Sequence, residues 1–181
     1  MRTVYNVIGN YVILTGMSVH EHKRHTPANL KIGIITASDT RTLDSDASGK
    51  LIRQLLEDAG HQVSYYELLP DEAERISSAI ATSLPTLDAI IVNGGTGITA
   101  RDRSADVVKS LIDKELEGFG ELFRMLSYQE IGSAAMMSRA VAGIRHGKFV
   151  AAIPGSTAAC KLAMEKLILP ELGHIVSLLK Q

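Results

Sequence analysis

The sequence LDAIIVNGGTG at residues 87–97 predicts the fold of this chain. Residues 87–92 form an apolar run of the length of a buried strand, and Gly94, Gly95 and Gly97 follow at its carboxyl end. Buried parallel strands have such continuous apolar runs, and open α/β sheets bind ligands outside the carboxyl ends of their strands. Glycines there let backbone N–H groups approach an anion closely. Taken alone, the motif could also be a turn that only reverses the chain.

Two strand–helix units precede this stretch. The apolar run 32–36 predicts a strand, and Leu51, Ile52, Leu55 and Leu56 predict a helix that Ser48 caps and Gly60 ends. Residues 61–69 predict the next strand, and Pro70-Asp71-Glu72 opens a helix that ends near Pro85. Strand–helix units in succession predict a parallel sheet with helices packed on it.

The second half of the chain predicts a mixed sheet. We expect a helix over Val107 to Ile112 that Ser104 or Asp102 caps, a helix over 121–129, a hairpin of strands 139–145 and 148–153 turning at His146-Gly147, and a terminal helix interrupted at Pro170. The fold class is therefore α/β, with residues 30–181 forming a single three-layer α/β/α domain. Its central sheet is expected to be mostly parallel with a hairpin at one edge. Residues 1–29 lie outside the pattern and are expected to form a mobile N-terminal extension.

Composition excludes several classes of function. The chain has 181 residues, enough for one domain with a full core, and a net charge of −1, which argues against nucleic-acid binding through a basic surface. It contains no apolar run long enough to span a bilayer, so we expect no membrane association. Cys160 is the only cysteine, which excludes an intramolecular disulfide and suits the reducing cytoplasm. We expect Cys160 to be a packed apolar residue rather than a nucleophile.

Parallel strands would bring four loops to one edge of the sheet. These loops contain Ser38-Asp39, Pro70-Asp71, Gly94-Gly95-Thr96-Gly97 with Asp102, and Pro154-Gly155-Ser156. The glycine loop and the helix start at Ser156 could each bind an anion, and Asp71 and Asp102 could share a Mg²⁺ ion beside substrate phosphates. Each residue also has a plainer explanation. Asp71 suits a helix start, Asp39 a local turn and Ser156 a helix cap.

Several separated motifs resemble the molybdopterin-binding family of molybdenum cofactor biosynthesis, most closely its MoaB branch. The motifs are Gly94-Gly95-Thr96-Gly97 with Arg101-Asp102, GFGELFRMLS at 118–127, SRAVAG at 138–143, and Pro154-Gly155-Ser156-Thr157. The resemblance covers about residues 30–170 and implies the same three-layer fold.

The resemblance implies a molybdopterin adenylyltransferase, which uses Mg²⁺ and ATP to attach AMP to the terminal phosphate of molybdopterin and releases pyrophosphate. The family's two functional acids fall on Asp71 and Asp102. Its pterin- and phosphate-binding loops fall on Ser38-Asp39, Gly94 to Gly97 and Pro154 to Ser156. The resemblance also implies a homotrimer, or a hexamer built as a dimer of trimers, with other cofactor-biosynthesis enzymes as further partners. The alternatives are a protein that binds molybdopterin or a precursor without chemistry, and an oligomeric scaffold.

The chain departs from the family pattern at two places. It has Arg103-Ser104-Ala105-Asp106 where many adenylyltransferases have Val-Thr-Pro-Glu, and Ser156-Thr157 where the sister branch has a different pair. Both departures concern substrate detail. Because the chain retains Asp71 and Asp102, the sequence favours an active enzyme.

Overall fold

The computed structural model describes residues 6–8, 11–13 and 29–181. The first two segments, β1 (Asn6–Ile8) and β2 (Tyr11–Ile13), pair with each other as antiparallel strands. The predicted mobility of residues 1–29 concerns a segment that lies mostly outside the described residues.

A six-stranded sheet forms the centre of the domain, with the strand order β4-β3-β5-β8-β7-β6. Its strands are β3 (Lys31–Ala37), β4 (Gln62–Leu69), β5 (Ala89–Asn93), β6 (Lys114–Glu115), β7 (Val141–Arg145) and β8 (Lys148–Ile153). The four strands β4, β3, β5 and β8 run parallel, while β7 pairs antiparallel with both β8 and β6. The apolar runs therefore form the mostly parallel sheet that the sequence predicts.

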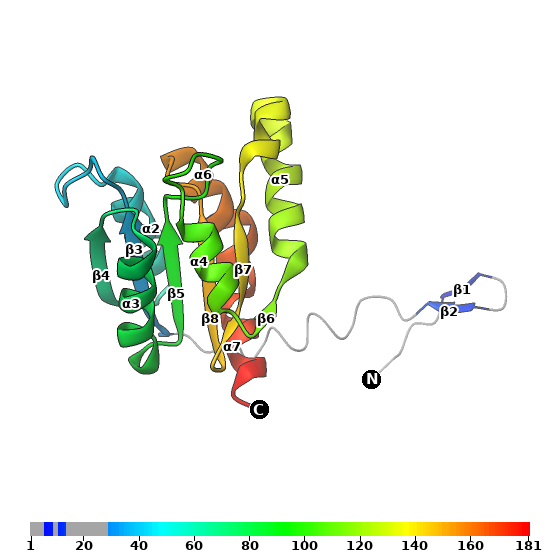
Figure 1. Cartoon of the computed structure of the whole chain (residues 1–181). Helices are drawn as coiled ribbons and strands as arrows, with labels where there is room; N and C mark the ends of the chain where they lie inside the picture. The colour runs from blue at the N-terminus through cyan, green and yellow to red at the C-terminus, as the bar shows by residue number, and fades with distance from the viewer. Residues whose placement is uncertain (1–5, 9–10, 14–28) are drawn as a thin grey trace.

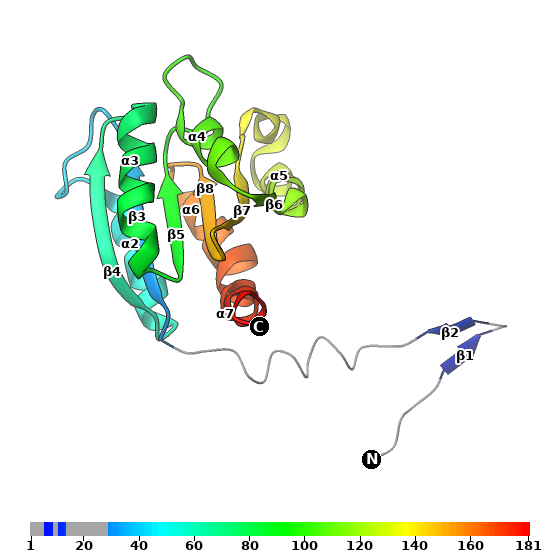
Figure 2. The ribbon, with the colours of Figure 1, turned by 60° about the horizontal axis from the view of Figure 1, so that its bottom comes forward.

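Helices cover both faces of this sheet (Figures 1 and 2). One face carries α3 (Ala73–Ser83) and α4 (Ser104–Leu111), and the other carries α2 (Ala47–Asp58), α5 (Glu117–Ile131), α6 (Thr157–Ala163) and α7 (Leu169–Leu179). Short 3₁₀ helices follow α3 and α5, at Leu84–Thr86 and Gly132–Met137. The three-layer α/β/α architecture is thus confirmed.

Each face of the sheet has its own apolar core. Alternate residues of a strand point to opposite faces, so Ile34 and Ile91 pack with α2, α6 and α7, whereas Ile35 and Ile90 pack with α3 and α4. All four side chains are fully buried. A sheet with both faces covered has the continuous apolar strands that the sequence shows.

Several helix ends differ from the sequence prediction. Asp46, not Ser48, caps α2, because its carboxylate accepts the Gly49 N–H. Neither Ser104 nor Asp102 caps α4, which has Arg103 at the cap position without a side-chain hydrogen bond. At the end of the chain, a π-helical turn at Met164–Ile168 joins α6 to α7, so the terminal helix is interrupted just before Pro170.

The part of the sheet beyond the hairpin is also more elaborate than predicted. The hairpin β7–β8 forms as expected, but the two-residue strand β6 pairs outside it. Helix α5 begins at Glu117 rather than Glu121, so Gly118-Phe119-Gly120 lies inside the helix instead of preceding it. Among the described residues, no helix is long and apolar enough to cross a membrane.

Candidate active site

The register of the parallel strands brings their carboxyl ends to one level. Thr36 of β3 pairs with Asn93 of β5, and Asn93 pairs in turn with Ile153 of β8. The loops that follow these strands line one cavity of about 400 Å³. Its lining residues are Ala37, Ser38, Arg41, Gly94, Gly95, Thr96, Gly97, Asp102, Met137, Ser138, Pro154 and Gly155. Three of the four predicted loops therefore meet at this cavity.

The glycine loop has a conformation that larger residues would strain. Gly94 has φ 97° and Gly95 has φ 60°, both in the left-handed region. A Cβ atom on Gly94 would collide with the carbonyl oxygen of Ala37, and one on Gly95 would collide with the carboxylate of Asp71. The glycines are thus required for the close approach of the β5 loop to its two neighbours, which keeps the cavity open to a ligand.

The two predicted acids lie beside the glycines of this loop, Asp71 next to Gly95 and Asp102 next to Gly97. Asp71 follows β4, contacts Gly95 and accepts a hydrogen bond from the Arg103 N–H at 3.1 Å. Burial raises the pKa of Asp71 above its usual value, and the neighbouring charges of Asp102 and Asp39 raise it further. The Arg103 N–H and the charge of Arg101 act in the opposite direction, so Asp71 is a partly buried carboxylate with charges of both signs nearby.

Asp102 is held by its own loop. Its carboxylate accepts the Thr99 N–H at 2.8 Å and the Thr99 hydroxyl at 2.6 Å. Although burial alone would raise the pKa of Asp102, these hydrogen bonds together with one from the Gly97 backbone and the charge of Arg139 lower it. Asp102 is therefore stabilised in the ionised form that a metal or a cationic ligand requires.

Two other predicted residues contact partners outside the cavity. The Ser156 hydroxyl accepts the Ala159 N–H and caps α6, and Asp39 pairs with Arg101. Neither side chain lines the cavity. Ser156 has the capping role that the sequence left open, whereas Asp39 contacts a distant residue, and Ser38 accepts the local turn bonds from the Thr40 and Arg41 N–H groups. The side chain of Asp71 lies behind the glycine loop rather than on the cavity wall.

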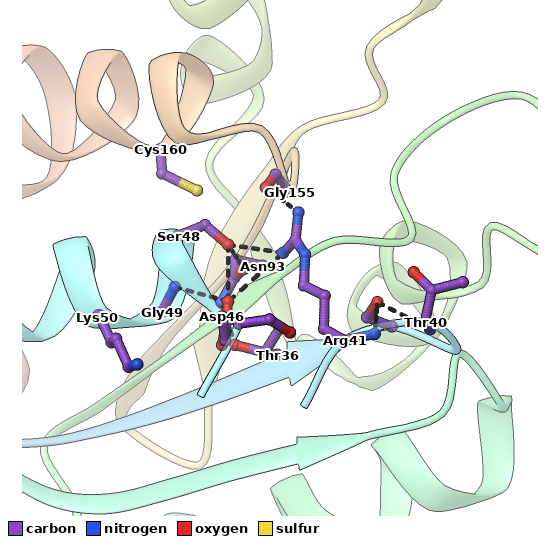
Figure 3. A network of polar contacts seen from close by, with 12 residues as sticks. Thr36, Thr40, Arg41, Asp46, Ser48, Gly49, Lys50, Asn93, Gly155 and Cys160 are labelled. Atoms are coloured by element: carbon purple, nitrogen blue, oxygen red, sulfur yellow. Dashed lines mark hydrogen bonds and ion pairs between the residues drawn. The ribbon is translucent and has the colours of Figure 1, made fainter. Parts of the chain in front are cut away.

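A polar network lies beneath the β3 loop at the start of α2, and Arg41 connects it to the cavity (Figure 3). Asp46 is fully buried, and its carboxylate accepts hydrogen bonds from Gly49 at 3.0 Å and from the Tyr66 hydroxyl at 2.7 Å. The Ser48 hydroxyl lies 3.0 Å from Asp46 and 2.9 Å from the amide oxygen of Asn93. Burial opposes ionisation of Asp46, but these bonds and one with Thr36 lower its pKa overall.

Sequence reasoning missed two arginines of the site. Arg41 donates to Ser48 at 2.7 Å and to the carbonyl of Gly155 at 2.8 Å, which links the β3 loop to the β8 loop. Arg139 binds the glycine loop from the segment before β7. Apart from Ser48, the partners of these arginines lie far away in the sequence, so spacing alone gives no signal. The polar Asn93 at the end of an apolar strand was a signal for the buried network.

Cys160 has the packing role that the sequence predicts. It is fully buried at the end of the network, and its thiol contacts the carbonyl of Pro154 at 3.1 Å. Burial raises the pKa of this thiol to about 12, so the reactive thiolate is not populated at neutral pH.

These features define a class of protein: a single α/β domain with a cavity at the carboxyl ends of its strands, the place where open α/β sheets bind ligands. Comparison with known proteins identifies the family. Residues 33–174 match the family model described as a probable molybdopterin binding domain. The chain belongs to this molybdopterin-binding family, which confirms the resemblance drawn from the sequence motifs.

Curated relatives and solved structures agree with this assignment. The chain is 51% identical to molybdenum cofactor biosynthesis protein B of Halalkalibacterium halodurans, over 88% of this chain and 96% of that protein. It is 50% identical to the protein of the same name from Bacillus subtilis, over 88% and 96%. A crystal structure of the tungsten cofactor synthesizing protein MoaB from Pyrococcus furiosus superposes with a TM-score of 0.77 at 38% identity, covering 86% of this chain and 99% of that one.

Proposed function

We propose that this chain is a molybdopterin adenylyltransferase, which transfers AMP from ATP to the terminal phosphate of molybdopterin and releases pyrophosphate. Relatives at about half identity carry names from molybdenum cofactor biosynthesis, which supports the pathway. The observation that carries the finer proposal is the position of Asp71 and Asp102 beside the glycines of a loop at the cavity. Binding a pterin alone does not require such a pair of acids.

The residues present fit a Mg²⁺ ion. Mg²⁺ is bound by one or two protein carboxylates, with waters and substrate phosphates as its other ligands, and the described residues offer no cluster of three or more metal-ligating side chains. Asp71 and Asp102 are the two carboxylates we assign to it, because a cation there would offset the repulsion that raises the pKa of Asp71. When bound, the ion would neutralise charge that develops on the phosphates during transfer.

The chain's own residues supply binding and orientation. The glycine loop and Arg41 both line the cavity, and the Arg41 guanidinium, which also pairs with Asp46 at 3.5 Å, brings a positive charge to it. Arg41 is fixed by Ser48 and Gly155, so little side-chain freedom is lost when an anion binds beside it. We therefore expect phosphate groups to lie between Arg41 and the glycine loop.

We also propose that the protein assembles as a homotrimer or as a hexamer of two trimers. Six large apolar side chains of α5 and the following 3₁₀ helix are exposed, namely Leu122, Met125, Tyr128, Ile131, Met136 and Met137. An exposed apolar surface of this kind marks a protein interface, and further copies of the chain are the partners we assign to it.

Because the reaction consumes ATP, we expect the protein to act in the cytoplasm.

The test is to incubate purified protein with molybdopterin, ATP and Mg²⁺ and to measure pyrophosphate. The proposal predicts pyrophosphate release that requires both molybdopterin and Mg²⁺, with adenylylated molybdopterin as the other product. Tight pterin binding without pyrophosphate release would replace the proposal with a non-catalytic binding protein. A protein that binds no pterin but assembles normally would be an oligomeric scaffold.

A further inference from the structure

Arg139 binds the glycine loop at two separate points. Its Nε donates to the carbonyl oxygen of Gly97 at 2.6 Å, and its Nη2 donates to the carbonyl oxygen of Asp102 at 2.7 Å. The backbone N–H of the same residue donates to the Thr96 carbonyl at 3.0 Å. One residue from the segment before β7 thus holds both ends of the part of the loop that leads to Asp102.

The remaining part of the guanidinium is fixed by Asp106. Nη1 of Arg139 donates to both carboxylate oxygens of Asp106, at 2.7 and 2.8 Å. Asp106 lies in the first turn of α4, directly after the loop. A guanidinium is a planar group with five donors in fixed directions, so three partners hold it in one orientation. A lysine ammonium has no such rigid, planar set of donors.

Other contacts hold other parts of the loop: the Gly94 N–H donates to the Ile153 carbonyl, the Arg103 N–H donates to Asp71, and Arg101 pairs with Asp39. Residues 94–103 contain no helix or strand, and Ile98 near the tip is 69% exposed. Within the loop, the turn at Thr99 fixes the Asp102 side chain, but the Gly97 and Asp102 carbonyls are bound from outside by Arg139. Without Arg139 the Asp102 carboxylate would keep its local turn and the Arg103 N–H its bond to Asp71. The Gly97 and Asp102 carbonyls would lose the side chain that binds them, and we expect the turn between them to move more freely.

We propose that Arg139 is a positioning residue that sets the place of Asp102 relative to Asp71, with Asp106 orienting its guanidinium. The effect that we expect on AMP transfer rests on the proposed function. The packing part of the inference, that Arg139 fixes the loop, is independent of any activity.

A second arginine–aspartate pair on β7 supplies the matched control. Arg145 donates to Asp113 at 2.7 Å at the opposite end of this strand, away from the cavity. The exposed fractions of the two pairs are comparable, at 35% and 59% for Arg139 and Asp106 and at 31% and 48% for Arg145 and Asp113. If Arg139 acts only through its ion pair, replacing Arg139 or Arg145 should change the hydrogen exchange of the loop and the AMP transfer to the same extent.

The experiment compares Arg139→Lys and Arg139→Gln with Arg145→Gln. Amide hydrogen exchange of residues 94–103 should become faster in both Arg139 variants and stay at the wild-type rate in Arg145→Gln. AMP transfer should fall about tenfold to a hundredfold in the Arg139 variants, the loss expected for a misplaced catalytic group, with the KM for molybdopterin little changed. Asp106→Glu, which keeps the carboxylate, should be closer to wild type than Asp106→Asn.

Hydrogen exchange tests the positioning role of Arg139, and AMP transfer tests the proposed reaction. Unchanged exchange of the loop in Arg139→Lys and Arg139→Gln, or an equal change in Arg145→Gln, would overturn the positioning role. Faster exchange in the Arg139 variants of a protein that transfers no AMP would leave the positioning role standing and would reject the proposed reaction instead.

Discussion

Two regions beside the strand-end cavity differ in how their aspartates are partnered: the network of Asp46, here the Asp46 side, and the loops of Asp71 and Asp102, here the Asp71 side. On one side, Asp46 is fully buried, yet hydrogen bonds lower its pKa and favour its charge. On the other side, burial and the charges of Asp102 and Asp39 raise the pKa of Asp71 and oppose its charge. The protein's own hydrogen bonds thus favour the charged form of Asp46 and of Asp102, but the balance goes the other way at Asp71.

Unpaired polar atoms occur on the same side as Asp71. Of the buried side-chain nitrogen and oxygen atoms in the described part of the chain, those without a hydrogen-bond partner are Ser104 Oγ and Ser138 Oγ. Ser104 lies against Gly95 beside Asp71, and Ser138 lines the cavity. Buried polar groups in native proteins nearly always have partners, so we expect a ligand to supply partners near these two hydroxyls.

The largest effect is expected when a carboxylate of the Asp71 side is replaced. Asp102→Asn and Asp71→Asn should each lower the rate of AMP transfer on the order of a hundredfold, because each removes charge that stabilises the transition state. Both should keep the fold and their affinity for molybdopterin. Steady-state pyrophosphate release checks the rate, with the exposed Asp44→Asn as the control that retains full activity. Wild-type turnover by both variants at saturating Mg²⁺ would contradict the assignment of the acids.

The next largest effect is expected when the buried carboxylate of the Asp46 side is replaced. Asp46→Asn should lower the free energy of unfolding by about 2 kcal/mol, because an amide cannot accept all of the bonds that the carboxylate accepts. The lowered pKa of Asp46 means that its ionised form stabilises the folded state above the unfolded pKa of about 3.9. The difference from wild type should therefore be constant from about pH 5 to 8 and shrink as the pH falls through the lowered pKa.

Chemical denaturation at several pH values measures this difference. Asp44→Asn, on the exposed loop before α2, should change the unfolding free energy by less than about 0.5 kcal/mol. A loss for Asp46→Asn that is equally small would show that the network is not a source of stability.

The smallest effect has the opposite sign. Asp71→Asn should raise the free energy of unfolding at pH 7 by up to about 1 kcal/mol, the size of an interaction between partly exposed charges. Asparagine removes the repulsion from Asp102 and Asp39 while its amide oxygen can still accept the Arg103 N–H. Thermal unfolding without Mg²⁺ provides the measurement. If Asp71→Asn lowered the free energy of unfolding as much as Asp46→Asn does, the two aspartates would not differ in the way described.

Local sequence signals predicted the sheet and the convergence of its loops. Apolar runs and glycines act over a few residues, so the strands, the β7–β8 hairpin and the cavity-lining Gly94 to Gly97 were predictable. The cap of α2 was harder, because Asp46 and Ser48 are both good caps and only the buried bonds to Tyr66 and Gly49 decide between them.

Features that depend on distant contacts could not be predicted. Gly120 reads as a helix breaker, but it lies inside α5 where a Cβ would stand 2.7 Å from the Ala140 carbonyl, so its function is close packing. The short strand β6 likewise depends on the approach of Lys114 to Gly143. Arg41 reaches Gly155 across 114 positions of sequence, a separation at which spacing gives no information.

Calorimetric titration with a non-cleavable ATP analogue tests the central claim most directly, that the Asp71 side is completed by Mg²⁺ and phosphate. We predict that wild-type protein binds the analogue only with Mg²⁺, that Asp71→Asn weakens this binding at least about tenfold, equivalent to 1.4 kcal/mol, and that Asp44→Asn binds like wild type. Equal affinity with and without Mg²⁺, or equal affinity in wild type and Asp71→Asn, would contradict the account.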